Sequence, residues 1–147
     1  MMINTLKEYF VDILEAITVK VDNVDTAILA NRVYTYPEED VEFPCGFVFL
    51  DRVHFEWHSI KTSQLDYTFK LQIRYSVDGN GSLDVVDNNL MDIVDAIFTK
   101  LGSDRRAGNN AFRLEANGGD MGWLDEAHSV RYADIIVEVM NVQRDVS

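Results

Sequence analysis

The strongest constraint on the fold is an uninterrupted run of alternating side chains, DYTFKLQIRYSV, from Asp66 to Val77. Apolar residues hold every second position and polar residues hold the positions between them. A repeat of two is the side-chain period of a β-strand, so this run predicts a strand with one buried face and one face in water. Half-buried strands of this kind are typical of antiparallel sheets.

Two further segments predict long strands. The run GFVFLDRVHFEW, from Gly46 to Trp57, is rich in aromatic and β-branched residues, which favour strands. Its apolar residues are expected on one pleat face, interrupted only by Asp51; they are Phe47, Phe49, Val53, Phe55 and Trp57. The run VRYADIIVEVMNV, residues 130–142, predicts a strand with two partly apolar faces. Short strands are expected at residues 33–36 and 111–116.

Apolar residues at helical spacing predict two long helices. The first covers residues 3–17, and Thr5-x-x-Glu8 has the form of a capping box at its start. The second runs from about Asp84 to Leu101, with Gly102 as the expected residue just past its end. Residues 18–44 are interpreted as a mostly exposed connection, and residues 103–128 as a loop-rich segment.

These elements predict a single α+β domain spanning residues 1–147. We expect a mainly antiparallel or mixed β-sheet of about four or five strands, with two long amphipathic helices packed on one face. The length of 147 residues suits one hydrophobic core, and no internal repeat is present. The chain carries 25 acidic and 13 basic residues, and its net charge of −12 disfavours tight binding to a phosphate backbone.

Cellular location is indicated by features that the sequence lacks. Cys45 is the only cysteine, so no disulfide can form within the chain, which suits a reducing compartment. The opening segment MMINTLKEYFVDIL has no basic stretch of the kind that begins a secretory signal, and no apolar run approaches membrane-spanning length. We therefore expect a soluble cytosolic protein without a membrane partner.

The segment VDGNGSLDVVDNN resembles the start of a calcium-binding EF-hand loop. Asp78, Asn80 and Ser82 occupy alternate positions, as the first ligands of such a loop do. However, Leu83 and Asn89 stand where the loop requires glycine and glutamate, and a strand instead of a helix is expected in front of it. The segment is therefore interpreted as a turn that leads into a capped helix.

Residues that could support metal binding or catalysis are few. His54, Glu56 and His58 would project from one strand face, and adjacent pairs at this spacing can hold zinc. Three ligands on one strand converge poorly on a tetrahedral ion, so a solvated or subunit-facing strand is the favoured interpretation, with metal binding left open. Cys45 is interpreted as a small packed residue. No Gly-x-Ser-x-Gly elbow and no phosphate-binding loop is present, so we expect neither an enzyme nor a cofactor.

The loop-rich segment contains the candidate partner contacts. Arg105 and Arg106 form a basic pair, and Met121 and Trp123 place apolar bulk among the glycines of NGGDMGW. Arginine, methionine and tryptophan are enriched in protein interfaces. The alternative is that Trp123 folds back over the edge of the core and that the arginines neutralise nearby acids.

In the order and texture of its segments, the chain resembles the tail terminator proteins of long-tailed bacteriophages, the minor tail protein U-like family of tail completion proteins. The segments that carry this resemblance are MINTLKEYFVDILEAI, FPCGFVFLDRV, DYTFKLQIRYSV, LDVVDNNLMDIVDAIFTKLG and YADIIVEVMNV. They extend over nearly the whole chain, although the family has no short diagnostic motif.

The resemblance implies a structural virion protein at the head–tail junction, assembled in the host cytoplasm. Such a protein forms a homo-oligomeric ring, expected to be hexameric, that caps the tail tube, ends tube polymerisation and meets the head–tail connector or neck protein. DNA would pass through the lumen without specific binding. The loops from Arg105 to Trp123 are expected to dock the tube. The alternatives are another neck or head-closure protein and, from a different class, a small α+β enzyme or ligand-binding module with a polar pocket.

Overall fold

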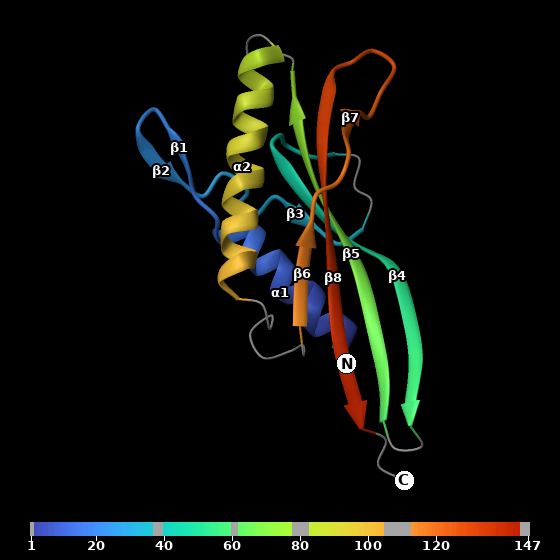
Figure 1. The fold of residues 1–147 in the computed structure, drawn as a ribbon. Helices are drawn as coiled ribbons and strands as arrows, with labels where there is room; N and C mark the ends of the chain where they lie inside the picture. Colours follow the sequence, from blue (N-terminus) through green and yellow to red (C-terminus); the bar gives the residue numbers. More distant parts are fainter. Residues whose placement is uncertain (1, 37–39, 60–61, 78–82, 105–112, 145–147) are drawn as a thin grey trace.

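The computed structural model describes residues 2–36, 40–59, 62–77, 83–104 and 113–144. Two helices and eight strands are present in this part of the chain (Figure 1). The helices are α1 (Met2–Ala16) and α2 (Leu83–Ser103), and the long strands are β4 (Cys45–Ser59), β5 (Thr62–Ser76) and β8 (Val130–Arg144). The short strands are β1 (Val19–Val21), β2 (Val24–Thr26), β3 (Val33–Tyr34), β6 (Arg113–Asn117) and β7 (Met121–Trp123).

The main sheet has six strands, with the order β3-β4-β5-β8-β6 and with β7 paired to β8. All of its pairs are antiparallel except β3 with β4. β5 lies at the centre and is paired on both sides, so that Phe69 lies opposite Val137 and Leu71 opposite Ile135. The predicted strand and its buried face are confirmed, because the alternate apolar side chains are buried; they are Tyr67, Phe69, Leu71, Ile73 and Tyr75. The other face was predicted to lie in water, and this is wrong: Gln72 is buried there and the remaining polar side chains are partly buried.

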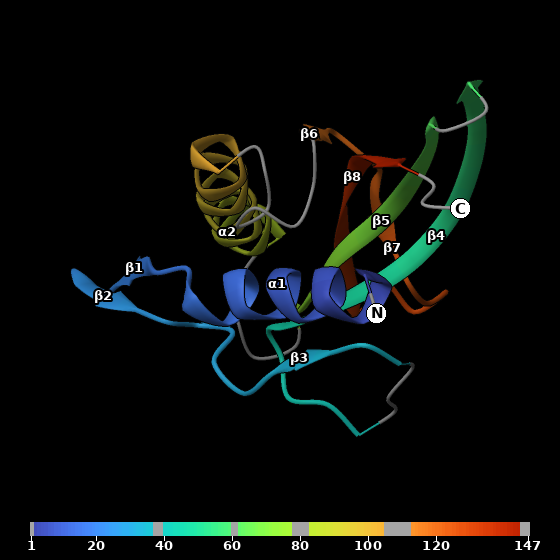
Figure 2. The ribbon, with the colours of Figure 1, turned by 90° about the horizontal axis from the view of Figure 1, so that it is seen from below.

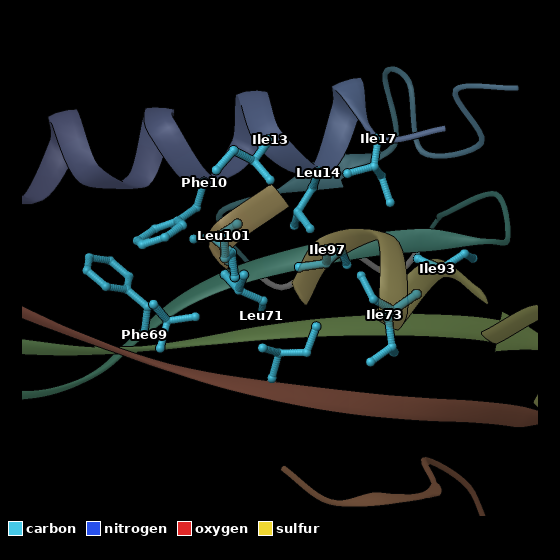
Figure 3. Close-up of a cluster of buried hydrophobic side chains, with 14 of the residues drawn as sticks. Phe10, Ile13, Leu14, Ile17, Phe69, Leu71, Ile73, Ile93, Ile97 and Leu101 are labelled. Carbon is cyan, nitrogen blue, oxygen red and sulfur yellow. The ribbon is translucent and has the colours of Figure 1, made fainter. Parts of the chain in front are cut away.

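The core lies between one face of this sheet and the two helices (Figure 3). The Phe10 ring of α1 lies 5.0 Å from the Phe69 ring of β5, measured between centroids. α1 packs on β3 and β4, whereas α2 packs on β5, β6 and β8. The helices also cross each other, because α1 runs across the view in Figure 2 while α2 points along it. We call the helix-covered face of the main sheet the core face and the opposite face the helix-free face.

The architecture predicted from the sequence is wrong. The main sheet has six strands instead of four or five, a separate two-stranded sheet is present, and strand residues outnumber helical ones among the described residues. Both helices lie on the core face, but they cross each other and cover different strands. The error has a physical cause: strands of three residues, such as β1, β2 and β7, are too short to show alternation.

Four local predictions are also corrected. α1 begins at Met2, so Thr5 lies inside the helix and does not cap it, and α2 continues through Gly102 to Ser103. Residues 18–44 are more than an exposed connection, because they contain β1, β2 and β3 and bury Leu29 completely. The apolar residues of residues 46–57 were predicted to share one face, and they do not.

A β-bulge at Asp51 explains this last correction. The register between β4 and β5 shifts between Leu50 and Arg52, so one extra residue reverses the alternation. Phe47 and Phe49 lie opposite Gln72 and Lys70 on the helix-free face. Beyond the bulge, Val53 lies opposite Tyr67, and Phe55 lies opposite Leu65, both on the core face.

Candidate functional site

Among the described residues, the β4 edge of the main sheet lacks a neighbouring strand over most of its length. β3 pairs with β4 only at Gly46 and Phe47. From Val48 to Ser59, the outer side of β4 has no strand partner within the described ranges. An unpaired edge offers a row of backbone donors and acceptors to another chain. The lower ends of β4, β5 and β8 also reach beyond both helices (Figure 1). We call residues Arg52–Ser59 with their partners Thr62–Thr68 the β4–β5 extension.

The core face of the β4–β5 extension carries exposed apolar side chains. Val53 is 48% exposed and Phe55 is 47% exposed, although both continue the face that buries Tyr67 and Phe69. The far end of β4 reaches beyond both helices, so the core face of the sheet extends farther than the helices that pack on it (Figure 2). Adjacent apolar residues left uncovered beside an open edge are typical of a surface for another protein.

The helix-free face of the β4–β5 extension is polar. Arg52, His54, Asp66, Thr68, Glu138 and Met140 line an open depression of about 330 Å³ on this face. Arg52 is exposed and forms no ion pair with any described residue. No group of three His, Cys, Asp or Glu side chains within the described part of the chain is arranged to hold a metal ion. The side chains of Glu56 and His58 lie outside that part, so metal binding with His54 stays untested.

The other half of the helix-free face is closed by its own side chains. Phe47 is fully buried there, and the Arg74 guanidinium lies 3.9 Å from the centre of its ring. Arg74 Nε donates a hydrogen bond to Gln72 Oε1, and Gln72 Nε2 donates one to Asp134 Oδ1, each at 2.8 Å. This chain of bonds ties β5 to β8. The surface here is packed and internally bonded, in contrast to the β4–β5 extension.

Cys45 lies in this closed half and is fully buried, which confirms the prediction of a small packed residue. Burial raises the pKa of its thiol to about 11, although the positive charges of Arg74 and Arg32 act in the opposite direction. A thiol with this pKa carries almost no thiolate at neutral pH, so Cys45 is poorly suited to act as a nucleophile.

The predicted partner contacts lie only partly within the described residues. Met121 and Trp123 both belong to β7, and Met121 is 39% exposed. Trp123 stacks on His128 with 4.9 Å between ring centres, and Arg131 lies 5.1 Å from the same indole. Trp123 is therefore held by its own subunit, while Met121 remains available to a partner. Arg105 and Arg106 lie outside the described residues, so their position relative to this pair stays untested.

Arg131 connects this region to the second helix. Its Nε atom lies 3.0 Å from Asp87 Oδ1 of α2, and both side chains are mostly buried. The Asp125 carboxylate accepts hydrogen bonds from the Ser129 hydroxyl and from the backbone of Ser129 and Val130, and these bonds lower its pKa. These contacts fix the turn between β7 and β8.

The β1–β2 hairpin is the surface that the sequence interpretation missed. It pairs only with itself and projects from the end of the molecule opposite the β4–β5 extension (Figures 1 and 2). Val21 lies opposite Val24 beside the turn, and these residues are 41% and 62% exposed. The turn residues Asp22 and Asn23 have φ angles of 51° and 65°. Asp-Asn between two valines is a short hairpin signal, because both residue types tolerate left-handed backbone angles.

The elements on either side of the EF-hand-like segment agree with its interpretation as a turn. Residues 78–82 lie outside the described part, but a strand precedes them and α2 begins at Leu83, as the turn interpretation expects. In the described part of the chain, neither helix combines the length and the apolar character that crossing a membrane requires.

The chain matches no known protein-family model and no curated protein, so no family membership is assigned.

Proposed function

We propose that this protein is a structural virion component that assembles into a ring, caps the tail tube, ends tube polymerisation and provides the interface to the head–tail connector. The resemblance of its segments to tail terminator proteins supports the link to a tail. Support for assembly comes from the β4–β5 extension. Catalysis has no part in the proposal.

The open edge of β4 is the observation that carries assembly. This edge lacks a strand partner from Val48 to Ser59 within the described residues, and Val53 beside it is 48% exposed. Contact with another copy would remove both the unpaired edge and the exposed apolar surface from water. Repeated head-to-tail contacts of one kind produce a closed ring when their rotation closes, so a single interface of this type suffices.

The charge distribution supports a lumen that DNA crosses without binding. The chain has a net charge of −12, and acidic side chains are exposed along both helices. They are Glu8 and Asp12 on α1 and Asp84, Asp92 and Asp95 on α2. Like charges repel a phosphate backbone, so a ring with acidic surfaces would let DNA slide instead of capturing it.

The first test is the mass of the purified protein by light scattering over a range of concentrations, with negative-stain images of any large species. A ring of about six copies with a central hole is expected, and its binding to purified tail tube should follow. A protein that stays monomeric both alone and with tail tube would contradict the proposal.

A further inference from the structure

The main sheet has two open edges within the described residues. Beyond its short pairing with β3, the outer side of β4 has no strand partner from Val48 to Ser59, and β6 pairs only with β8. The two strands lie at opposite ends of the strand order, as Figures 1 and 2 show. An edge strand offers unpaired backbone N–H and C=O groups to another strand. Each copy of the chain therefore presents a β4 edge and a β6 edge.

On the β4 edge, residues of the core face direct their backbone groups outward. Gly46 donates its N–H to the carbonyl of Arg32, at 2.9 Å, on the side away from β5. A Cβ at Gly46 would meet core side chains, so this residue belongs to the core face. Hydrogen-bonding direction alternates along a strand together with the side-chain face. Because the pairing with β5 resumes beyond the bulge, Val53 and Phe55 point their N–H and C=O groups at the open edge.

On the β6 edge, residues of the same face also direct their backbone groups outward. Asp134 of β8 donates its N–H to the carbonyl of Asp120, at 2.8 Å, on the side where β6 and β7 lie. Every second residue of β8 beyond Asp134 points the same way, and these residues lie opposite Asn117, Glu115 and Arg113. The residues between them, Leu114 and Ala116, therefore point their backbone groups away from β8. Both pack in the hydrophobic core.

The two edges match in face and in strand direction. In an antiparallel pair, residues that exchange hydrogen bonds lie directly opposite each other, with their side chains on the same face. We propose that β4 beyond the bulge pairs with β6 of a second copy of this chain, with Phe55 opposite the neighbour's Leu114 and Val53 opposite its Ala116. The pairing is antiparallel, so it continues the alternation of β4, β5, β8 and β6. The contact is head-to-tail; it rests on the self-association in the proposed function and specifies the strands that produce it.

The irregularities of β4 select this register. It places the five residues of β6 opposite residues 52–56, which lie between the two shifts in the β4–β5 pairing. A shift of two residues in one direction would lay the end of β6 on the bulge at Asp51. A shift of two in the other direction would lay its start on the irregularity between Trp57 and Ser59. The proposed register avoids both, and Asp51 stays outside the pairing.

The exposed apolar residues of the β4–β5 extension gain cover from this pairing. α2 packs on β6 in each copy. The neighbour's α2 therefore comes to lie on the same side of the joined sheet as Val53 and Phe55, which are 48% and 47% exposed in the single subunit. Removing such surface from water favours association.

On the helix-free face, the register brings positive residues to Glu115. Within its own subunit Glu115 lies opposite Glu138, although it also forms an ion pair with Arg113. Like charges directly opposite each other destabilise a strand pair. In the joined sheet, Glu115 lies opposite His54 of the neighbour and diagonal to its Arg52, which forms no ion pair with any described residue of its own subunit. The pairing therefore relieves a repulsion that the single subunit contains.

Disulfide trapping between two variants tests the strand pairing. His54→Cys and Glu115→Cys are purified separately with tags of different size, mixed at a concentration where light scattering shows oligomers, and oxidised mildly. Directly opposite residues have Cα atoms about 4.5–5.5 Å apart, which a disulfide can bridge. The mixed dimer should exceed either same-variant dimer by roughly fivefold or more, because a head-to-tail contact brings only unlike positions together.

A matched control tests the register. Asn117→Cys lies two residues along β6 and is more exposed than position 115, so accessibility alone would favour its reaction with His54→Cys. The proposed register predicts the reverse, with roughly fivefold less mixed product than Glu115→Cys gives, because the offset adds about 7 Å along the strand. The wild-type protein has only the fully buried Cys45 and should give no covalent product.

A proline on the edge tests the backbone contact. Val53→Pro removes an N–H that points at the open edge, so the subunit should still fold, since proline is tolerated on edge strands. The association constant should fall by about tenfold or more, because backbone bonds supply much of the affinity when a strand is added to a sheet. Val53→Thr keeps the N–H and should lose less. Urea denaturation checks that each monomer is folded, and Ala116→Pro tests the same contact from β6.

Other outcomes overturn the inference in recognisable ways. A dominant His54→Cys dimer would show that two β4 edges meet, and a dominant Glu115→Cys dimer would show that two β6 edges meet. Oligomers that form without the mixed product, or that Val53→Pro and Ala116→Pro leave unchanged, would overturn the strand pairing while leaving the ring in place. Monomers in every assay, with and without tail tube, would overturn both proposals.

Discussion

The two halves of β4 contain similar residues in opposite environments. In the first half, Val48 is fully buried beneath the helices, and Phe47 is fully buried on the other face beneath Arg74. In the second half, Val53 and Phe55 are nearly half exposed. Apolar residue types occupy both halves, so hydrophobicity along the chain does not distinguish them. The difference lies in which other elements pack on each half, because β3 ends beside Phe47 and the helices end before the extension.

The bulge at Asp51 separates these halves and changes what the second half presents. Without the extra residue, Val53 and Phe55 would fall on the helix-free face with Phe47 and Phe49. With it, they continue the core face past the end of the core. The fold therefore presents core-type surface at an open edge, which is what a subunit interface requires.

The largest expected difference between the two regions concerns a matched pair of phenylalanines. Phe69 is fully buried against Phe10, so Phe69→Ala should lower the free energy of unfolding by about 3–5 kcal/mol through lost burial and a cavity. Phe55 is 47% exposed, so Phe55→Ala should cost less than about 1 kcal/mol. Urea denaturation of the monomer measures both values, and equal losses would show that the extension belongs to the core.

The same pair separates folding from association. Phe55→Ala should weaken oligomer formation, measured by light scattering, even though the monomer remains folded. Phe69→Ala should affect association only through the fraction of protein that is unfolded.

Long elements could be predicted from the sequence because their patterns are long. The alternation from Asp66 to Val77 marks β5, and apolar spacing places the start of α2 within a residue or two of Leu83. The bulge could not be predicted, since one extra residue at Asp51 leaves the apolar pattern looking regular while reversing the faces. The three-residue strands β1 and β2 are below the length at which alternation is visible.

The candidate site was harder to predict, because the exposure of a residue depends on whether a helix or strand from elsewhere in the chain packs on it. Nothing near Val53 in the sequence shows that the helices stop short of it. Trp123 illustrates the converse: its ring contacts His128 and Arg131, which only the fold of the β7–β8 turn brings close. Met121, two residues earlier, remains exposed. Two large apolar side chains of one strand therefore differ: Trp123 packs within its own subunit, and Met121 stays exposed to a partner.

An effect of intermediate size is expected from Cys45, whose titration changes the free energy of unfolding and tests the burial of the first half of β4. Burial raises the pKa of its thiol to about 11, so between about pH 9 and 11 the unfolded chain loses this proton while the folded chain keeps it. The contribution is fully present below pH 9 and is lost as the pH rises through 11, with a size on the order of 2 kcal/mol. Wild-type stability should therefore fall more steeply over this range than that of Cys45→Ala. Parallel pH profiles would show that the thiol is accessible to water in the folded state.

The smallest expected effect concerns the turn of the β1–β2 hairpin, the other region with exposed apolar side chains. Asn23 has a φ of 65°, which alanine adopts at a cost of about 1 kcal/mol and glycine adopts freely. Because the hairpin pairs only with itself, Asn23→Ala should lower hydrogen-exchange protection at Val21 and Val24 by roughly fivefold while leaving the core amides unchanged. Asn23→Gly should leave the hydrogen-exchange protection of both the hairpin and the core unchanged. A parallel loss of protection in β5 would mean that the hairpin unfolds together with the core, and its exposed valines would then contribute to the stability of the single subunit.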